Sequence, residues 1–183
     1  MKFILAFAIL LSPVVSYALV TGQAADIIFY EGQKRALYSN PLEDYYRDER
    51  KRPNFMIEPN TVSSDNWRGY IATWEIKDNT LYMTNIESWI GRRRATLESL
   101  FGSKCRNGRV EAAWFSGDLR IPDGKQLQYV HMGYGSVYER DIILTVEAGK
   151  ITKTVTIDNT KRQLPSEIEL QRRELDKMKR EKP

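Results

Sequence analysis

The sequence has 183 residues, of which 28% are charged and 42% hydrophobic, with a formal net charge of +4 at pH 7. This length predicts one folded domain with its own core, and so mild a basic balance gives no reason to expect a nucleic-acid partner. A single cysteine, Cys105, excludes an internal disulfide, so hydrophobic burial has to stabilise the fold. Cys105 is then expected either as a buried thiol or in an intermolecular bridge.

The N-terminus has the pattern of a secretory signal peptide. Lys2 precedes an apolar run over residues 3–15, and Ser16 and Ala18 place small side chains at positions −3 and −1 of a cleavage site. A membrane anchor is disfavoured because residues 3–20 reach only the lower limit of a membrane span and Ser12-Pro13 interrupts them. We therefore expect residues 1–18 to be removed. The mature chain, which has no further apolar run of spanning length, would act in the periplasm or outside the cell.

A short strand and a short helix are predicted next. Residues 26–31 (DIIFYE) are rich in side chains that favour β-structure. Asn40 and Pro41 have the pattern of a helix N-cap followed by the first helical residue. Pro53 ends this helix, because proline removes a helical hydrogen bond and clashes with the preceding turn.

The strongest local pattern is a hairpin over residues 67–88. Asp78-Asn79 suit a two-residue turn, which needs positive φ angles. With that turn, Ile76 lies opposite Leu81 and Trp74 lies opposite Met83, so the apolar side chains share one face. The other face is predicted to carry Thr73, Glu75, Lys77, Tyr82 and Thr84.

Two further hairpins are predicted by the same reasoning. A turn at Ser116-Gly117 would place Trp114 opposite Leu119 and Ala112 opposite Ile121. A turn at Ala148-Gly149 would place Val146 opposite Ile151. Three successive hairpins of this kind are typical of a meandering antiparallel sheet.

Two helices complete the predicted fold. Residues 90–101 carry apolar side chains at helical spacing and end at Gly102. The charged tail, residues 164–183, begins with the capping pattern Ser166 to Glu169. The expected fold class is thus α+β: a single domain, residues 19–163, in which short helices pack on one face of the antiparallel sheet, followed by a charged C-terminal helix.

Several blocks of the sequence resemble a family of small, functionally uncharacterised bacterial proteins. The blocks are WRGYIATWEI, DNTLYM, AAWFSGDLRIPDGK and YVHMGYGSVYERDIILTVEAGK, which together span about residues 67–150. The family is built on a W-E-I, turn, L-Y-L hairpin and a later W-F-S-G, G-Y-x-S-x-Y block. The resemblance implies a bacterial origin and carries over no catalytic residues.

The stretch HMGYGSVYERD, residues 131–141, contains the only histidine and allows three interpretations. In an active site, His131 would be a general base oriented by Glu139 or Asp141, although no nucleophile motif accompanies it. As a binding loop, the stretch would present Tyr134, Ser136, Tyr138 and Arg140, with exposed tyrosines giving contact area at low entropic cost. As a structural corner, its glycines would bend the chain between two strands.

A cationic region forms the second candidate site, with Arg92, Arg93 and Arg94 followed by Lys104, Arg106 and Arg109. Such a cluster can bind an anionic glycan, lipid head groups or nucleic acid, but a basic run is also typical of a solvated surface. Metal binding is not expected, since one histidine and one distant cysteine match no ligand spacing. No cofactor is expected either.

These observations favour an exported bacterial binding protein without enzymatic activity, such as an inhibitor or immunity-type factor. Its partner would be a protein or an anionic component of the cell envelope. The alternative is a hydrolase or transferase that acts on envelope material through His131. An envelope structural component is a third class that the sequence leaves open.

Overall fold

In a computed structural model of the chain, residues 23–59, 65–130, 133–164 and 169 are described. This part is mostly β-structure, and its strands are β1 Asp26–Tyr30, β2 Gln33–Leu37, β3 Phe55–Met56, β4 Tyr70–Lys77, β5 Thr80–Ile90, β6 Arg93–Arg94, β7 Val110–Glu111, β8 Gly117–Gln128, β9 Val137–Glu147 and β10 Lys150–Asp158. The helices are short: α1 Pro41–Tyr45, α2 Leu97–Phe101, and the 3₁₀ turns η1 Glu49–Lys51 and η2 Gly102–Lys104.

The strands form one open, mixed sheet in the order β2-β1-β4-β5-β10-β9-β8, with β3, β6 and β7 each paired to β5. All pairs are antiparallel except β1 and β4, which run parallel. A parallel pair needs a crossover connection, and here the chain carries β2, α1, η1 and β3 between the two strands. The α+β class is therefore confirmed in outline, while a purely antiparallel meander is wrong at this pair.

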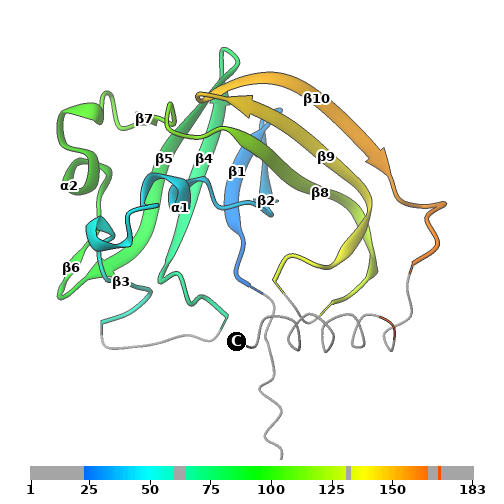
Figure 1. Cartoon of the computed structure of the whole chain (residues 1–183), viewed down its shortest axis with the longest axis horizontal. Coiled ribbons are helices and arrows are strands. Elements are labelled where there is room, and N and C mark those ends of the chain that lie inside the picture. The colour runs from blue at the N-terminus through cyan, green and yellow to red at the C-terminus, as the bar shows by residue number, and fades with distance from the viewer. Residues whose placement is uncertain (1–22, 60–64, 131–132, 165–168, 170–183) are drawn as a thin grey trace, which may run out of the picture.

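The sheet is strongly curled, so that β2 and β8, the two ends of the strand order, meet. The Tyr38 N–H, just after β2, donates to the Arg120 carbonyl of β8 at 2.8 Å. Beside it, Arg35 forms an ion pair with Asp123 at 2.6 Å. Figure 1 shows β8, β9 and β10 arching over one side of the molecule, with β4 and β5 on the other.

The first predicted hairpin is confirmed in its turn and register. Ile76 pairs with Leu81 and Trp74 with Met83, while Asp78 and Asn79 both have positive φ angles, 50° and 56°. A register shift between Thr73 and Trp74 was not expected. Thr73 is also buried rather than on a solvated face, and it lies opposite Ile27 of the neighbouring strand β1.

The predicted turn at Ala148-Gly149 is also confirmed, since Val146 pairs with Ile151. The turn needs glycine for two reasons. Gly149 has a φ of +80°, and a Cβ there would lie 2.8 Å from the Ala112 carbonyl oxygen.

The predicted hairpin at Ser116-Gly117 is wrong. β7 pairs with β5, where Val110 lies opposite Met83, and β8 pairs with β9. The cause is a non-local set of hydrogen bonds: the Ala112 N–H donates to the Leu81 carbonyl, and the Gly149 N–H donates to the Phe115 carbonyl, both at 2.9 Å. The segment after β7 is thereby held between β5 and the β9–β10 turn.

The predicted helix over residues 90–101 is wrong in its first half. Ile90 still belongs to β5, and Gly91, with a φ of +60°, lies in the turn that leads into β6. Helix α2 begins only after Thr96, whose hydroxyl accepts from the Ser99 N–H at 3.1 Å, and ends at Gly102 as expected. The predicted signal peptide lies outside the described residues, as does the C-terminal helix apart from Leu164 and Glu169.

The core contains Trp74, which is fully buried as predicted. Trp114 is only half-buried, and its Nε1–H donates to the Pro41 carbonyl at 2.9 Å. Its ring stacks on Phe101 of α2 at a centroid distance of 5.5 Å and meets Tyr45 of α1 at 4.8 Å. Trp114 therefore joins the two α-helices to the segment between β7 and β8.

Cys105 is a free, half-buried thiol whose Sγ donates to Glu98 at 3.4 Å. Burial, followed by the Glu98 carboxylate, raises its pKa. Among the described residues, no helix has the length and apolar character needed to cross a membrane.

Candidate functional site

The candidate stretch, residues 131–141, runs from the β8–β9 connection into β9, and Arg120 of β8 donates hydrogen bonds to three of its residues. The Arg120 guanidinium donates to the Tyr134 carbonyl at 2.6 Å, to the Ser136 carbonyl at 2.8 Å and to the Asp141 carboxylate at 2.8 Å. The buried Ser136 hydroxyl accepts from the Val130 N–H at 3.1 Å. These contacts close the corner from inside, so the described part of the stretch has the geometry of a structural corner.

Both tyrosines of this corner are half-buried and bonded within the molecule, so the expectation that they are exposed is wrong. Tyr134 stacks on Tyr38 at a centroid distance of 4.9 Å, and its hydroxyl accepts from the Asn40 side chain at 2.9 Å. The Tyr138 hydroxyl lies 3.0 Å from that of Tyr38. Burial raises the pKa of Tyr38 and of Tyr134, which keeps these phenols protonated.

The acids proposed to orient His131 already have internal partners. Asp141 accepts from Arg120 and, at 2.9 Å, from the Asn159 amide. Glu139 accepts from the Lys125 N–H at 3.1 Å. Arg140 forms an ion pair with Asp123 at 2.8 Å. His131 itself lies outside the described residues, so its relation to these acids stays a prediction.

The predicted cationic cluster is divided among three places. Arg92, Arg93 and Arg94 are exposed at the β5–β6 turn, where Arg94 lies over the Trp89 ring at 5.1 Å. Lys104 of η2 lies over Tyr45 at 5.4 Å. Arg106 is exposed, and its backbone pairs with that of Arg109.

Within the predicted cationic cluster, Arg109 forms an ion pair with an acidic side chain, Glu75. Its guanidinium lies 3.4 Å from Glu75 and 5.6 Å from the Tyr82 ring centroid, on the β4–β5 hairpin. Each group of cations thus has its own aromatic neighbour, and the six do not form one anion-binding surface.

Sequence reasoning missed a buried ion pair that joins β1 to the start of β4. Asp26 is fully buried and Arg68 is 1% exposed, and the Arg68 Nη1 donates to Asp26 Oδ1 at 3.0 Å. Asp26 also accepts from the Trp74 indole N–H at 3.0 Å and the Ala72 N–H at 3.2 Å. Burial raises the pKa of the Asp26 carboxyl, against the opposing effects of Arg68 and these donors.

Polar contacts continue from this pair towards the surface. Arg52 donates to the Arg68 carbonyl at 2.7 Å and forms an ion pair with Glu43 at 3.2 Å. The Tyr70 side chain is buried, and this burial, followed by the nearby acids Asp26 and Glu43, raises its pKa far above the ordinary value. Glu43 and Arg52 are thus fixed from the inside while their outer sides face a depression of the surface.

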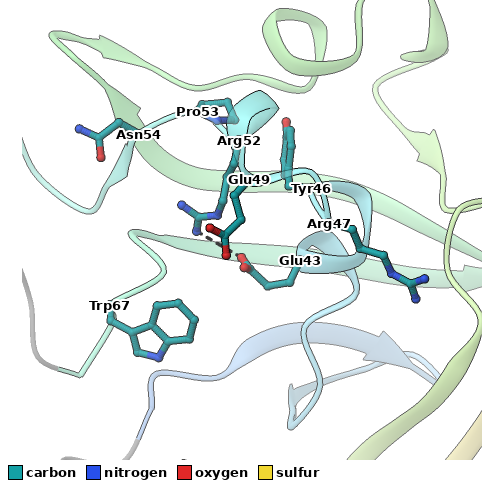
Figure 2. A pocket seen from close by; sticks show the side chains of 8 residues that line it. All are labelled: Glu43, Tyr46, Arg47, Glu49, Arg52, Pro53, Asn54 and Trp67. Atoms are coloured by element: carbon teal, nitrogen blue, oxygen red, sulfur yellow. Dashed lines mark hydrogen bonds and ion pairs between the residues drawn. The ribbon is translucent and has the colours of Figure 1, made fainter. Parts of the chain in front are cut away.

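This depression lies between α1, η1 and the segment before β4, and has a volume of about 500 Å³. Its lining residues are Glu43, Tyr46, Arg47, Glu49, Arg52, Pro53, Asn54 and Trp67. Figure 2 shows Trp67 across the depression from the Glu43–Arg52 ion pair. We call it the Trp67 depression. Trp67 is 65% exposed, the most exposed large hydrophobic side chain of the described residues.

The Trp67 depression combines residue types that are common in protein interfaces. Two arginines and two glutamates surround it, and tryptophan, tyrosine and arginine are the residues most enriched at binding hot spots. Among the described residues, no group of three or more metal-ligating side chains is close enough to hold an ion. The sequence pattern indicated only that Trp67 begins a hairpin. The exposure of its side chain is evident from the structure alone.

Comparisons of this chain with models of protein families, with curated proteins and with solved structures returned no match.

Proposed function

We propose that this chain is an exported bacterial binding protein without enzymatic activity, and that it recognises a protein partner through the Trp67 depression. The observation that carries the proposal is the exposure of Trp67 beside anchored charges of both signs. A large aromatic side chain held open to solvent costs solvation free energy, and burial in a partner would recover it.

The charges of the depression favour a polypeptide over an anionic glycan or lipid. Glu43, Glu49, Arg47 and Arg52 all line the depression, so it carries two carboxylates and two guanidinium groups. A uniformly anionic ligand would be repelled by the two carboxylates, whereas a protein surface can match both signs. The partner class is therefore narrowed from a protein or an anionic envelope component to a protein.

Support for export comes from residues 1–18, whose charged start, apolar centre and small-residue end match a signal peptide. An inhibitor or immunity-type factor acts by such one-to-one recognition, and the predicted compartment places its partner in the envelope or outside the cell. The alternative of a hydrolase using His131 gains no support from Glu139 and Asp141, whose carboxylates are engaged by other groups.

Affinity capture from envelope extract tests the proposal with matched variants. Wild-type protein should retain a discrete partner that Trp67→Ala binds at least tenfold more weakly, because truncating a central aromatic anchor removes a hot spot. Arg47→Glu, at a side chain 75% exposed, should also weaken capture. Leu127→Ala, at a side chain 40% exposed outside the depression, should have no effect. Equal capture by Trp67→Ala and the wild type would overturn the proposed site.

A further inference from the structure

Among the described residues, no strand pairs with one edge of β10 for most of its length, and we call this its free edge. It pairs with β9 from Lys150 to Asp158, but with β5 only at Lys150 opposite Thr80. The cause is β7, which pairs with β5 at Tyr82 and Met83 and so occupies the position next to β5 where β10 would otherwise continue. Figure 1 shows β10 curving away along the outside of the molecule.

The side chains of this edge strand are exposed on both faces. From Thr152 to Asp158 every residue of β10 is exposed, including Val155 at 39% and Ile157 at 45%. The strand is rich in β-branched residues and contains no proline. Protein edge strands ordinarily carry charges, prolines or covering segments that prevent pairing with another chain, and among the described residues only Lys153 and Asp158 serve that purpose here.

The direction of the backbone groups follows from one hydrogen bond at the end of the strand. The Asn159 N–H donates to the Glu139 carbonyl of β9 at 2.8 Å. Backbone N–H and C=O groups point alternately to the two sides of a strand. Those of Thr154, Thr156 and Asp158 therefore point away from β9, towards the free edge.

The outward N–H and C=O groups of β10 can pair with the same groups of a second copy that is related by a two-fold axis. With Thr156 opposite Thr156 of a second copy, Thr154 lies opposite Asp158 and every outward group meets another outward group. The same register places Val155 opposite Ile157 on one face, so the two exposed apolar side chains of each copy cover those of the other.

We propose that β10 pairs antiparallel with β10 of a second copy of this chain, centred on Thr156, and so continues the sheet across a symmetric dimer. The charges agree with this register, because Lys153 falls opposite Asn159 and Asp158 opposite Thr154. A register centred on Asp158 would place two carboxylates opposite one another. Closed two-fold pairing also uses the same surface on both copies, as the commonest homo-oligomers do.

Disulfide formation at single positions tests the register directly. In a Cys105→Ser background, Thr156→Cys should form a disulfide-linked dimer on mild oxidation, because residues opposite one another in a hydrogen-bonded pair have Cα atoms about 5.5 Å apart, within disulfide range. Thr154→Cys and Asp158→Cys alone should each cross-link at least tenfold more slowly. In this register each residue is displaced by four positions from the same residue of the second copy, which is about 13 Å at about 3.3 Å per residue. A mixture of those two variants should give the cross-linked heterodimer.

A second measurement leaves the wild-type cysteine in place. Thr156→Pro removes an outward N–H and no hydrogen bond to β9, so the sheet should survive, as circular dichroism can verify. Sedimentation should show a concentration-dependent dimer for the wild type and at least a tenfold larger dissociation constant for Thr156→Pro. Equal cross-linking at residues 154, 156 and 158, or a wild-type monomer at all concentrations, would overturn the proposal.

Discussion

Replacing Asp26 by asparagine tests the buried ion pair that links β1 to β4. The change preserves shape but removes the negative charge beside Arg68, which is 1% exposed. The amide also has one carbonyl oxygen in place of two carboxylate oxygens, so it cannot accept from Arg68 and from the Trp74 indole at separate atoms as Asp26 does. Breaking a buried pair by removing one partner costs about 3–5 kcal/mol, because an uncompensated charge stays buried. We expect Asp26→Asn to lower the free energy of unfolding by that amount.

Urea unfolding followed by tryptophan fluorescence and circular dichroism measures this loss. Lys150→Met is the matched control, since Lys150 forms a 2.8 Å ion pair with Glu111 in which the side chains are 54% and 43% exposed. An exposed pair of this kind contributes about 1 kcal/mol or less. The double variant Asp26→Asn, Arg68→Met should lose less than the sum of the two single variants, because it removes the stranded charge. A loss below about 1 kcal/mol for Asp26→Asn, similar to the control, would refute the reasoning.

Three further outcomes are expected. Trp74→Ala should cost about 3–5 kcal/mol in a urea melt, because the ring is fully buried, whereas half-buried Trp114→Ala should cost less; equal losses would contradict this packing. Hydrogen bonds from Arg140 and Arg35 lower the pKa of Asp123 below 3.8, so this carboxylate stabilises the fold above that pH and the contribution is lost as pH falls through the lowered value. The unfolding free energies of the wild type and Asp123→Asn should therefore differ near neutral pH and converge in acid, and a pH-independent difference would exclude this linkage. Ala18→Asp should block signal-peptide processing, since a charge does not fit at position −1; mass spectrometry of exported wild-type protein that still begins at Met1 would disprove the cleavage itself.

Local patterns predicted the local parts of this fold. The turns at Asp78-Asn79 and Ala148-Gly149 were predictable with their registers, because each depends on adjacent residues and on alternation along two short strands. The pairing of β7 with β5 was not, since the alternation at Val110 and Glu111 fits either neighbour and only hydrogen bonds from distant strands decide between them.

The candidate site was harder to predict for the same reason. Asp26 and Arg68 are 42 residues apart in the sequence, and nothing near either one identifies the other. Their place in a candidate binding loop indicated that Tyr134 and Tyr138 would be exposed, whereas the distant Tyr38 packs against both rings. The exposure of Trp67 depends on how α1 and η1 are placed beside it, which no short stretch of sequence specifies.

Site-specific photo-cross-linking in cells tests the proposed recognition site most directly. A photo-reactive phenylalanine derivative in place of Trp67 would report what contacts the depression, and the same derivative in place of Leu127, exposed elsewhere on β8, is the control. We predict a discrete protein adduct from position 67, none of that mass from position 127, and loss of the adduct when Arg47→Glu is added. Identical adducts from both positions, or none from position 67 in cells that export the protein, would contradict it.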